Sequence, residues 1–535
     1  MPTSSDASTV KSASGQRRAY MIGGGIGSLA AAAFLIRDAG FPGDAITVFE
    51  ATQVLGGALD GAGSPETGYS LRGGRMLTSD NYECTWDLFR TIPSIYEDGV
   101  SVYDETMAFN RLHVSHAQAR LVDSRRARVP VASMGFSMHD RVDLLKLHSA
   151  SEDSLGTSRI TDHFSPDFFE TEFWKMWATT FAFQPWHSAV ELRRYMHRFV
   201  MEFGRIETLA GVKRTKFNQY DAFVRPLERW LIDRGVRFVT GCTVTDIAHG
   251  IDRGQFAVTG LTCQHKGKTD TVAVGPDDLV FLQNGSMTDA SSLGSMTAPP
   301  PKLGKADCTG WALWEKLAAV RPEFGYPGAF TGPIAQTSWE SFTVTMRNPA
   351  FLRMMQAFSG NEAGTGGLVT FRDSRWFMSI VIPYQPYFAG QPEDTQVFWG
   401  YALFPDRIGD FVAKPMSECS GAEILAELRG HLRIDPETLD TAICIPCWMP
   451  YITSMFMPRK AGDRPNPVPD GSRNLAFVSQ FVEVPEDVVF TVEFSIRAAQ
   501  MAVYQLCGVS RPIPAVSPYD KSLRVQFEAL VKAFK

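Results

Sequence analysis

The chain has 535 residues, 44% of them hydrophobic, and a formal net charge of -6. Because this length exceeds what one compact core normally holds, we expect two or more domains. The negative charge and the lack of long Lys/Arg runs argue against a nucleic-acid partner. Residues 1–16 are small and polar, without the apolar stretch of a secretion signal, and no apolar run reaches spanning length. We expect a cytoplasmic protein with a disordered N-terminus.

The first predicted elements form a dinucleotide-binding unit at the start of the chain. An apolar strand, a glycine turn and an alanine-rich helix lead into a second strand that ends at Glu50. Gly23 permits the tight turn, and Gly25 lets backbone N–H groups and the helix N-terminus approach a pyrophosphate. Glu50 stands where an acid bonds a ribose hydroxyl. Ser28 replaces the usual third glycine, with Gly27 beside it, and we interpret this as a small departure.

A second glycine-dense stretch covers residues 51–77 and ends in Gly73-Gly74-Arg75. Backbone that packs closely on a flat ligand explains so many glycines, although a plain surface loop is the alternative. In two-domain flavoproteins such a stretch runs along the cofactor, with an arginine near the pyrophosphate.

Helical patterns follow over residues 84–103 and 157–203. The second segment is rich in Phe and Trp on more than one side, which implies burial or an apolar cavity. Core packing is the commoner cause of such richness, and an apolar ligand is the alternative.

Short β-rich runs occupy residues 235–259 and 270–287, and the last run, residues 278–287, resembles a strand that returns to the cofactor sheet. A Pro-Pro-Pro run at 299–301 marks a boundary, beyond which helices and strands alternate. Residues 473–508 read as a strand, a turn and a long helix. The distance of this late unit from the glycine turn predicts a discontinuous cofactor domain.

The C-terminal tail is amphipathic, with lysines opposite an apolar face. It either docks onto its own protein or lies on a membrane surface. The apolar face is formed by Leu523, Phe527, Leu530, Val531 and Phe534.

The cysteines and histidines give no sign of a disulfide framework or a metal. Eight cysteines are scattered along a chain that has its own cores, so free thiols are expected. Cys444 and Cys447 have C-x-x-C spacing, but without a second pair a structural role is favoured. The ten histidines show no H-x-x-x-H pairing, and no metal site is predicted.

Six long stretches of the chain between Arg18 and about Gly508 read RGGRMLTSDNYECTWDLFRTIPS, SAVELRRYMHRF, GVKRTKFNQYDAFVRPLERWL, DLVFLQNGSMT, CIPCWMPYITSMFMPR and QFVEVPEDVVFTVEFSIRAAQ. Together they resemble the oleate hydratase family, also called the myosin-cross-reactive antigen family. The resemblance implies a hydro-lyase that adds water to the cis-9 double bond of an unsaturated fatty acid, converting oleic acid to 10-hydroxystearic acid. FAD is then needed for architecture and electrostatics, with no net electron transfer.

The resemblance also implies the fold. We expect an α/β protein with a discontinuous, Rossmann-like FAD-binding domain, an inserted mixed α/β substrate domain, and helical lid and C-terminal segments. The expected ranges are 17–150, 205–298 and 446–508 for the FAD-binding domain, 151–204 for the lid, 299–445 for the substrate domain and 509–535 for the tail. The expected FAD-binding residues are Gly23, Gly25, Ile26, Gly27, Ser28, Glu50, Gly56, Gly57, Arg75, Ser286, Phe490, Thr491 and Glu493.

Hydration of an isolated alkene needs an acid at one carbon and a base for the water at the other, in a dry site. The resemblance implies that Tyr195 is the acid. The family's glutamate base is replaced by Met76, which cannot take a proton. One extra residue before Cys84 either re-aims Asp80 as the base or leaves the water to backbone and flavin, and Asp80 is alternatively a helix N-cap.

The position of the substrate carboxylate departs from the family too. Where many relatives carry Thr, Asn and His, this chain has Val381, Pro383 and Tyr387, so the carboxylate is held otherwise or the head group differs. Gln219 matches a family residue at the substrate or flavin site.

Other functions remain open at this point. The same fold hosts FAD oxidoreductases that act on lipids or amines, because fold alone does not fix function. A flavin-bound fatty-acid carrier that has lost catalysis is the other alternative. Compared with many relatives the chain is shorter at both ends, where dimer or membrane contacts form, so we expect a monomer with possible peripheral membrane contact.

Overall fold

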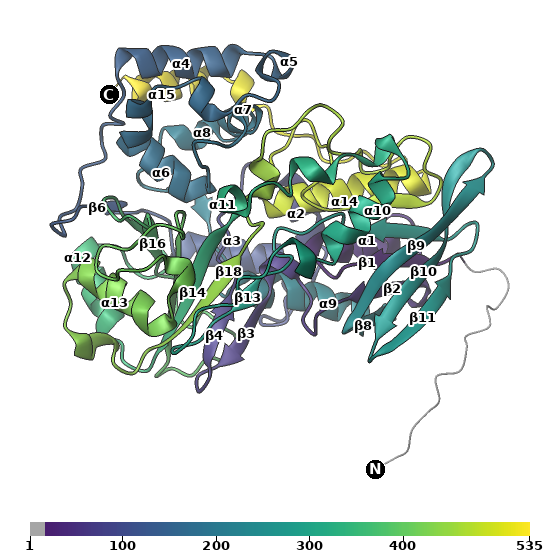
Figure 1. The fold of residues 1–535 in the computed structure, drawn as a ribbon, viewed down its shortest axis with the longest axis horizontal. Helices are drawn as coiled ribbons and strands as arrows, with labels where there is room; N and C mark the ends of the chain where they lie inside the picture. Colours follow the sequence, from purple (N-terminus) through teal and green to yellow (C-terminus); the bar gives the residue numbers. More distant parts are fainter. Residues whose placement is uncertain (1–16, 535) are drawn as a thin grey trace.

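A five-stranded parallel sheet carries the N-terminal glycine turn (Figure 1). The computed structural model describes residues 17–534, so the segment predicted to be disordered lies outside the described residues. In spatial order the strands are β19 (Leu475–Phe477), β12 (Leu279–Leu282), β1 (Ala19–Ile22), β2 (Ile46–Glu50) and β8 (Arg237–Thr240).

Strands and helices from both ends of the chain complete this sheet. β12 pairs in parallel with β1 on one side and with β19 on the other, so the expected return of residues 278–287 to the sheet is confirmed. Helix α1 (Ile26–Arg37) presents small alanine side chains that are fully buried. This allows α14 (Val492–Cys507) to pack closely against it. The last segment of the chain therefore closes the fold that the first segment opens.

A seven-stranded sheet forms the second layer system, with helices α12 (Ala350–Ser359) and α13 (Gly421–Leu432) around a smaller core of its own. Cys444 and Cys447 are buried in this sheet, and all eight cysteines are free thiols, as expected. In spatial order the strands are β13 (Ser292–Leu293), β18 (Ile443–Met449), β14 (Trp339–Met346), β17 (Gln396–Ala402), β16 (Met378–Val381), β15 (Leu368–Phe371) and β6 (Leu121–Val122).

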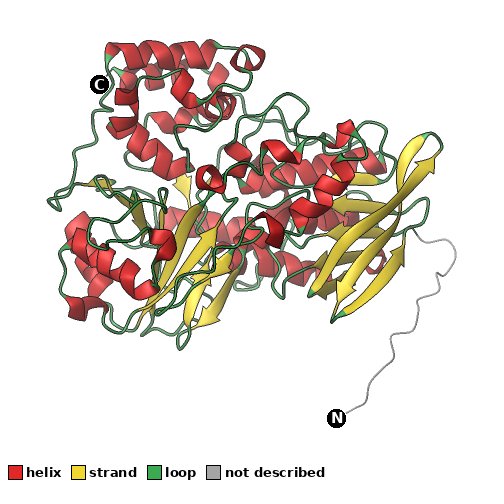
Figure 2. Ribbon diagram, in the orientation of Figure 1, coloured by secondary structure: helices red, strands yellow, loops and turns green. Residues whose placement is uncertain are grey.

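The predicted β-rich runs first give β8 of the parallel sheet and then, from residue 242, a three-stranded antiparallel sheet at the edge of the molecule (Figure 2). Its strands are β9 (Cys242–Asp252), β10 (Gln255–His265) and β11 (Lys268–Ala273). The α/β fold class is thus confirmed. The remaining elements are β3 (Gly61–Ser64), β4 (Gly68–Leu71), β5 (Leu77–Thr78), β7 (Val212–Lys213), α9 (Arg225–Ile232), α10 (Gly310–Ala318) and α11 (Ile334–Thr337).

The single helix predicted over residues 84–103 is wrong. The chain forms α2 (Glu83–Phe89) and α3 (Val102–Leu112), with an irregular connection between them. Pro93 in this connection has no N–H to donate and cannot continue a helix. Ser101 then starts α3 with a capping box, since its side chain accepts the N–H of Asp104 and the Asp104 carboxylate accepts the N–H of Ser101.

A cluster of helices forms the upper part of the molecule in Figure 1. It contains the predicted aromatic-rich segment, which breaks into several short helices rather than one. The members are α4 (Met138–Ser149), α5 (Glu152–Leu155), α6 (Glu172–Phe181), α7 (Ala189–Arg198), α8 (Val200–Phe203) and α15 (Leu523–Ala533).

Helix α15 docks onto this cluster without burying its apolar face. Arg141 donates to the carbonyl oxygen of Ala533, and Lys532 forms an ion pair with Glu207. The apolar side chains of α15 stay exposed, Leu523 by 83% and Phe527 by 65%. Among the helices of residues 17–534, none combines the length and the apolar character needed to cross a membrane.

Candidate active site

Two neighbouring cavities share part of their walls. We call the first, around the glycine turn, the cofactor cavity, and the second, among apolar side chains, the apolar cavity. Arg75, Phe490, Thr491 and Val492 line both, so the two cavities meet at these residues.

The cofactor cavity is built by the end of β1, the start of α1 and the end of β2. Gly25 is the N-cap of α1 without a side-chain cap, which leaves the N–H groups of the first turn for an anion. Gly23 and Gly56 have φ values of +94° and +105°, a region that favours glycine. Predicted residues in its lining are Gly23, Gly25, Ile26, Gly27, Glu50, Gly56, Gly57, Arg75, Ser286, Phe490 and Thr491.

Glu50 lies in this cavity at the end of β2, as the dinucleotide motif requires. One carboxylate oxygen accepts the N–H of Gly24 at 2.7 Å, and the other accepts the N–H and hydroxyl of Thr52, each at 2.8 Å. The side chain is therefore held at the mouth of the glycine turn.

Two residues predicted to bind the cofactor do not line the cavity. Ser28 is fully buried inside α1. The Glu493 carboxylate instead accepts the N–H groups of Cys84 at 3.0 Å and Thr85 at 2.8 Å, and it pairs with Arg497 at 2.9 Å. Glu493 thus stabilises the start of α2, and the structure corrects a direct cofactor role for both residues.

Arg75 stands at the junction of the cavities as a buried cation. It donates to the carbonyl oxygen of Ala58 at 3.2 Å, and no carboxylate among residues 17–534 lies within ion-pair distance. Burial lowers its pKa to about 10. Because an unpaired buried charge is costly, this guanidinium is suited to an anionic ligand.

The apolar cavity lies between the helix cluster and the seven-stranded sheet. The sequence left core packing and an apolar cavity open as explanations of the aromatic-rich segment. Both apply, since Phe181 and Phe199 line the cavity while Trp177 packs in the core. Its main apolar lining residues are Leu77, Phe109, Phe181, Phe199, Ile206, Leu209, Val212, Trp339, Val381 and Trp399.

Tyr195, on α7, lines this cavity and is 1% exposed. Its hydroxyl donates to the carbonyl oxygen of Val489 at 2.6 Å. Burial is the main cause that raises the pKa of Tyr195 well above its usual range, so the phenol stays protonated at neutral pH. The hydroxyl therefore carries a proton into the apolar cavity, although the raised pKa makes it a weaker acid than a free phenol.

Met76 also lines the apolar cavity, whereas Asp80 does not. The Asp80 side chain is 41% exposed and lies 3.6 Å from Arg205. It does not cap α2 either, because the N-cap residue is Tyr82 and makes no side-chain cap bond. The N-cap alternative for Asp80 is therefore wrong, and its carboxylate does not face the cavity.

Sequence reasoning missed Glu202, the only carboxylate in the lining of the apolar cavity. Glu202 lies on α8, is 6% exposed, and pairs with Arg205 at 2.6 Å. No helical spacing from Tyr195 could have found it, because Phe199 interrupts the helix between Tyr195 on α7 and Glu202 on α8.

The residues predicted at the substrate head group come together in the apolar cavity. Val381, Pro383, Tyr387 and Gln219 all line it. The Gln219 side-chain oxygen accepts the N–H of Arg75 at 3.0 Å, which ties the head-group residues to the junction with the cofactor cavity.

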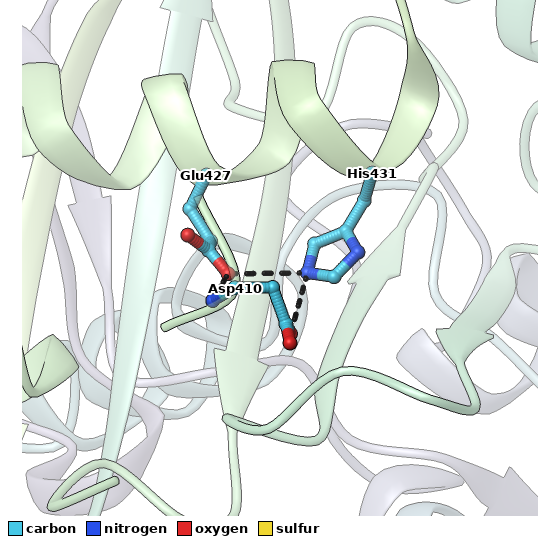
Figure 3. A group of neighbouring side chains, drawn as sticks. All are labelled: Asp410, Glu427 and His431. Atoms are coloured by element: carbon cyan, nitrogen blue, oxygen red, sulfur yellow. Dashed lines mark hydrogen bonds and ion pairs between the residues drawn. The ribbon is translucent and has the colours of Figure 1, made fainter. Parts of the chain in front are cut away.

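A group of possible metal ligands lies outside both cavities, where the histidine pattern had indicated none (Figure 3). His431 Nε2 is 3.3 Å from a Glu427 oxygen and 3.7 Å from an Asp410 oxygen. The Glu427 carboxylate already accepts three backbone N–H groups, from residues 410–412. Arg375 lies 3.5 Å from Asp410. These bonds anchor a loop to α13.

A parallel sheet whose glycine turn opens into a cavity beside an apolar one defines a Rossmann-like dinucleotide-binding fold. Cyclohexylamine oxidase from Brevibacterium oxydans IH-35A has a similar fold, with a TM-score of 0.52 and 11% identity over 92% of this chain and 99% of that one. The profile of the MCRA family matches residues 16–504, and the chain belongs to this family.

Two relatives match almost the whole chain. The oleate hydratase of Streptococcus pyogenes serotype M49 (strain NZ131) is 38% identical over 537 residues, which cover 97% of this chain and 89% of the relative. The linoleate hydratase of Lactiplantibacillus plantarum is 34% identical over 562 residues, covering 97% and 98%. The family resemblance of the six stretches is confirmed.

Proposed function

We propose that this protein adds water to the cis-9 double bond of an unsaturated fatty acid, forming 10-hydroxystearic acid from oleic acid. One observation carries the proposal: a protonated, buried tyrosine hydroxyl lines an apolar cavity that adjoins a cofactor cavity, in a chain 38% identical to an oleate hydratase.

We propose FAD as the cofactor. The residues fit this group because the Arg75 guanidinium lines the cavity without a carboxylate partner among residues 17–534, and because the N-terminus of α1 is uncapped. A Cβ on Gly25 would lie 2.7 Å from the Gln283 amide, so the glycine keeps the cavity open. When bound, the flavin supplies charge and shape beside the apolar cavity without net electron transfer.

Tyr195 protonates one alkene carbon and water attacks the other. In this structure the Tyr195 hydroxyl donates its hydrogen bond to the Val489 carbonyl oxygen. The hydroxyl must therefore rotate toward the alkene before it can transfer its proton. The apolar lining excludes bulk water, which strengthens the hydroxyl's interaction with the developing charge.

The attacking water must lose a proton, and Met76 cannot accept it. We propose Glu202 as the acceptor because it is the cavity's only carboxylate. Asp80, the base suggested by the sequence, is outside the cavity lining, and Arg205 contacts both Asp80 and Glu202. Glu202→Gln should lower turnover about 10²–10⁴-fold, whereas Asp80→Asn should change it little. The reverse result would return the role to Asp80, and no loss in either variant would leave it to backbone and flavin.

Anaerobic incubation with oleate in ¹⁸O-water tests the reaction. Hydration incorporates one solvent oxygen into the product and consumes no electron acceptor. Product formation that requires an electron acceptor would favour an FAD oxidoreductase, and tight oleate binding without product would favour a carrier.

We also propose that the protein is a cytoplasmic monomer that touches membranes peripherally. The exposed Leu523 and Phe527 on α15 support the membrane contact. Light scattering after gel filtration tests the monomer. Co-sedimentation with vesicles tests the contact, which Phe527→Glu should weaken.

A further inference from the structure

Arg214 is a buried cation in the apolar cavity that the proposed chemistry does not use. Its Nε and Nη2 atoms are buried and have no hydrogen-bond partner. No carboxylate within residues 17–534 lies within ion-pair distance of it, and Glu202, the one acid in the lining, is paired with Arg205. Burial lowers the pKa of Arg214 to about 10. The guanidinium stays charged at neutral pH and lacks a counter-ion.

The backbone of Arg214 is fixed in place. Asn110 accepts its N–H at 2.9 Å and donates to its carbonyl oxygen at 2.7 Å. Both Arg214 and Asn110 therefore hold one defined position at the end of β7. This arrangement aims the side chain while leaving its own donors free.

The guanidinium lies where the head-group residues of the cavity gather. Its Nη1 atom is 3.4 Å from the place of a Cβ on Gly367, and Gly367 accepts the N–H of Ile382. Ile382 stands between Val381 and Pro383, two positions at which family members hold the carboxylate with polar side chains. Arg214 thus occupies the region that these substitutions made apolar.

A second buried cation raises the need for an anion here. Arg120, which is 1% exposed, donates to the Thr180 hydroxyl at 2.9 Å and also lacks a carboxylate partner within residues 17–534. The pKa of Arg120 is lowered chiefly by burial and further by the charge of Arg214. Unlike Arg214, Arg120 does not line the cavity, so of these two cations Arg214 is the one that can meet a ligand there.

We propose that Arg214 binds the carboxylate of the fatty acid and thereby selects free acids over uncharged lipids. The site rests on the proposed function for its ligand class. A guanidinium presents two parallel N–H donors to a carboxylate, and a dry cavity strengthens that pairing. The cofactor is excluded as the anion because Arg214 does not line the cofactor cavity.

The test measures binding rather than turnover. Trp339 and Trp399 line the cavity, so tryptophan fluorescence of the flavin-loaded protein reports ligand binding. Oleate is compared with oleyl alcohol, which has the same chain and no charge. The variants are Arg214→Met, Arg214→Lys and, as a matched control, Lys213→Met, which removes a charge one residue away and outside the cavity lining.

Arg214→Met should weaken oleate binding by about 30-fold or more, the low end for truncating one partner of a buried charge pair. Oleyl alcohol binding should change less than about threefold, because an uncharged head has little to lose. Arg214→Lys should fall between the wild type and Arg214→Met for oleate, and Lys213→Met should bind both ligands normally.

Equal weakening of both ligands, or unchanged oleate binding, would overturn the proposal. If Arg214→Met fails to fold, the proposal is decided by Arg214→Lys and by the wild-type preference for oleate over oleyl alcohol. A wild-type protein that binds the alcohol as tightly as oleate also refutes the proposal. Failure of hydration leaves this test intact: oleate binding that depends on Arg214 without product would refute only the proposed reaction.

Discussion

Tyr195→Phe tests the proposed proton donor because it removes one oxygen and keeps the ring. General acid catalysis contributes about 10²–10⁴-fold in rate, so kcat should fall by that factor, equivalent to about 3–5 kcal/mol of activation free energy. KM should change little, since the apolar contacts with the substrate chain remain.

The same substitution also has a structural cost. The buried Tyr195 hydroxyl donates to the Val489 carbonyl at 2.6 Å, so Tyr195→Phe leaves that carbonyl without this hydrogen bond. The free energy of unfolding should fall by about 1–3 kcal/mol. Loss of stability alone does not identify a proton donor, and a matched control is needed.

Tyr82→Phe is that control. Tyr82 lines the same cavity, is 3% exposed, and donates to the Met76 carbonyl at 3.1 Å. Both variants lose a buried hydroxyl bonded to a carbonyl, but only Tyr195 is proposed to give up its proton. The measurements are 10-hydroxystearate formation at saturating oleate and denaturant unfolding of each flavin-loaded protein. A Tyr195→Phe variant with kcat within a few-fold of Tyr82→Phe would refute the reasoning.

Three further outcomes are expected. Gly25→Val should fold but lose its flavin, because the new side chain enters the cofactor cavity and meets only the flexible Gln283, and a yellow purified variant would contradict this. Gly27→Ala should instead lower the free energy of unfolding by about 1–3 kcal/mol even without cofactor, because its Cβ would clash with the backbone oxygen of Val478. His187 is fully buried and its pKa is lowered by burial to about 3, so the unfolded chain binds its proton first. Stability should be complete above about pH 6.5 and fall towards pH 3, and urea unfolding of His187→Gln across this range should show a smaller decline.

The sequence predicted the cofactor cavity because a dinucleotide-binding turn is a local pattern. Its glycines, strand ends and acid lie within one short segment, and Gly23, Gly25 and Glu50 all reached the cavity. Ser28 and Glu493 did not, because proximity in sequence to a binding residue does not fix the direction of a side chain. Glu493 follows three lining residues, yet its carboxylate turns toward the N-terminus of α2.

The head-group residues Val381, Pro383, Tyr387 and Gln219 were found through the family resemblance, and they share one cavity although more than 150 residues separate Gln219 from the other three. Glu202 was not found, because its proposed role depends on where its carboxylate lies after folding. Pairing with Arg205 and burial in the cavity wall are tertiary properties. No spacing rule reports them.

Charge balance in the two cavities gives a physical reason for the pattern of substitutions. Met76 removes a carboxylate from the turn that also carries Arg75, and Glu202 is already balanced by Arg205. Two guanidinium groups in the cavity linings, those of Arg75 and Arg214, are left without a carboxylate within the described chain. A protein rarely keeps unpaired buried charges unless a ligand completes them. Arg75 faces both cavities and Arg214 only the apolar one, so one anion is expected from the cofactor side and a second, a fatty-acid carboxylate, from the substrate side.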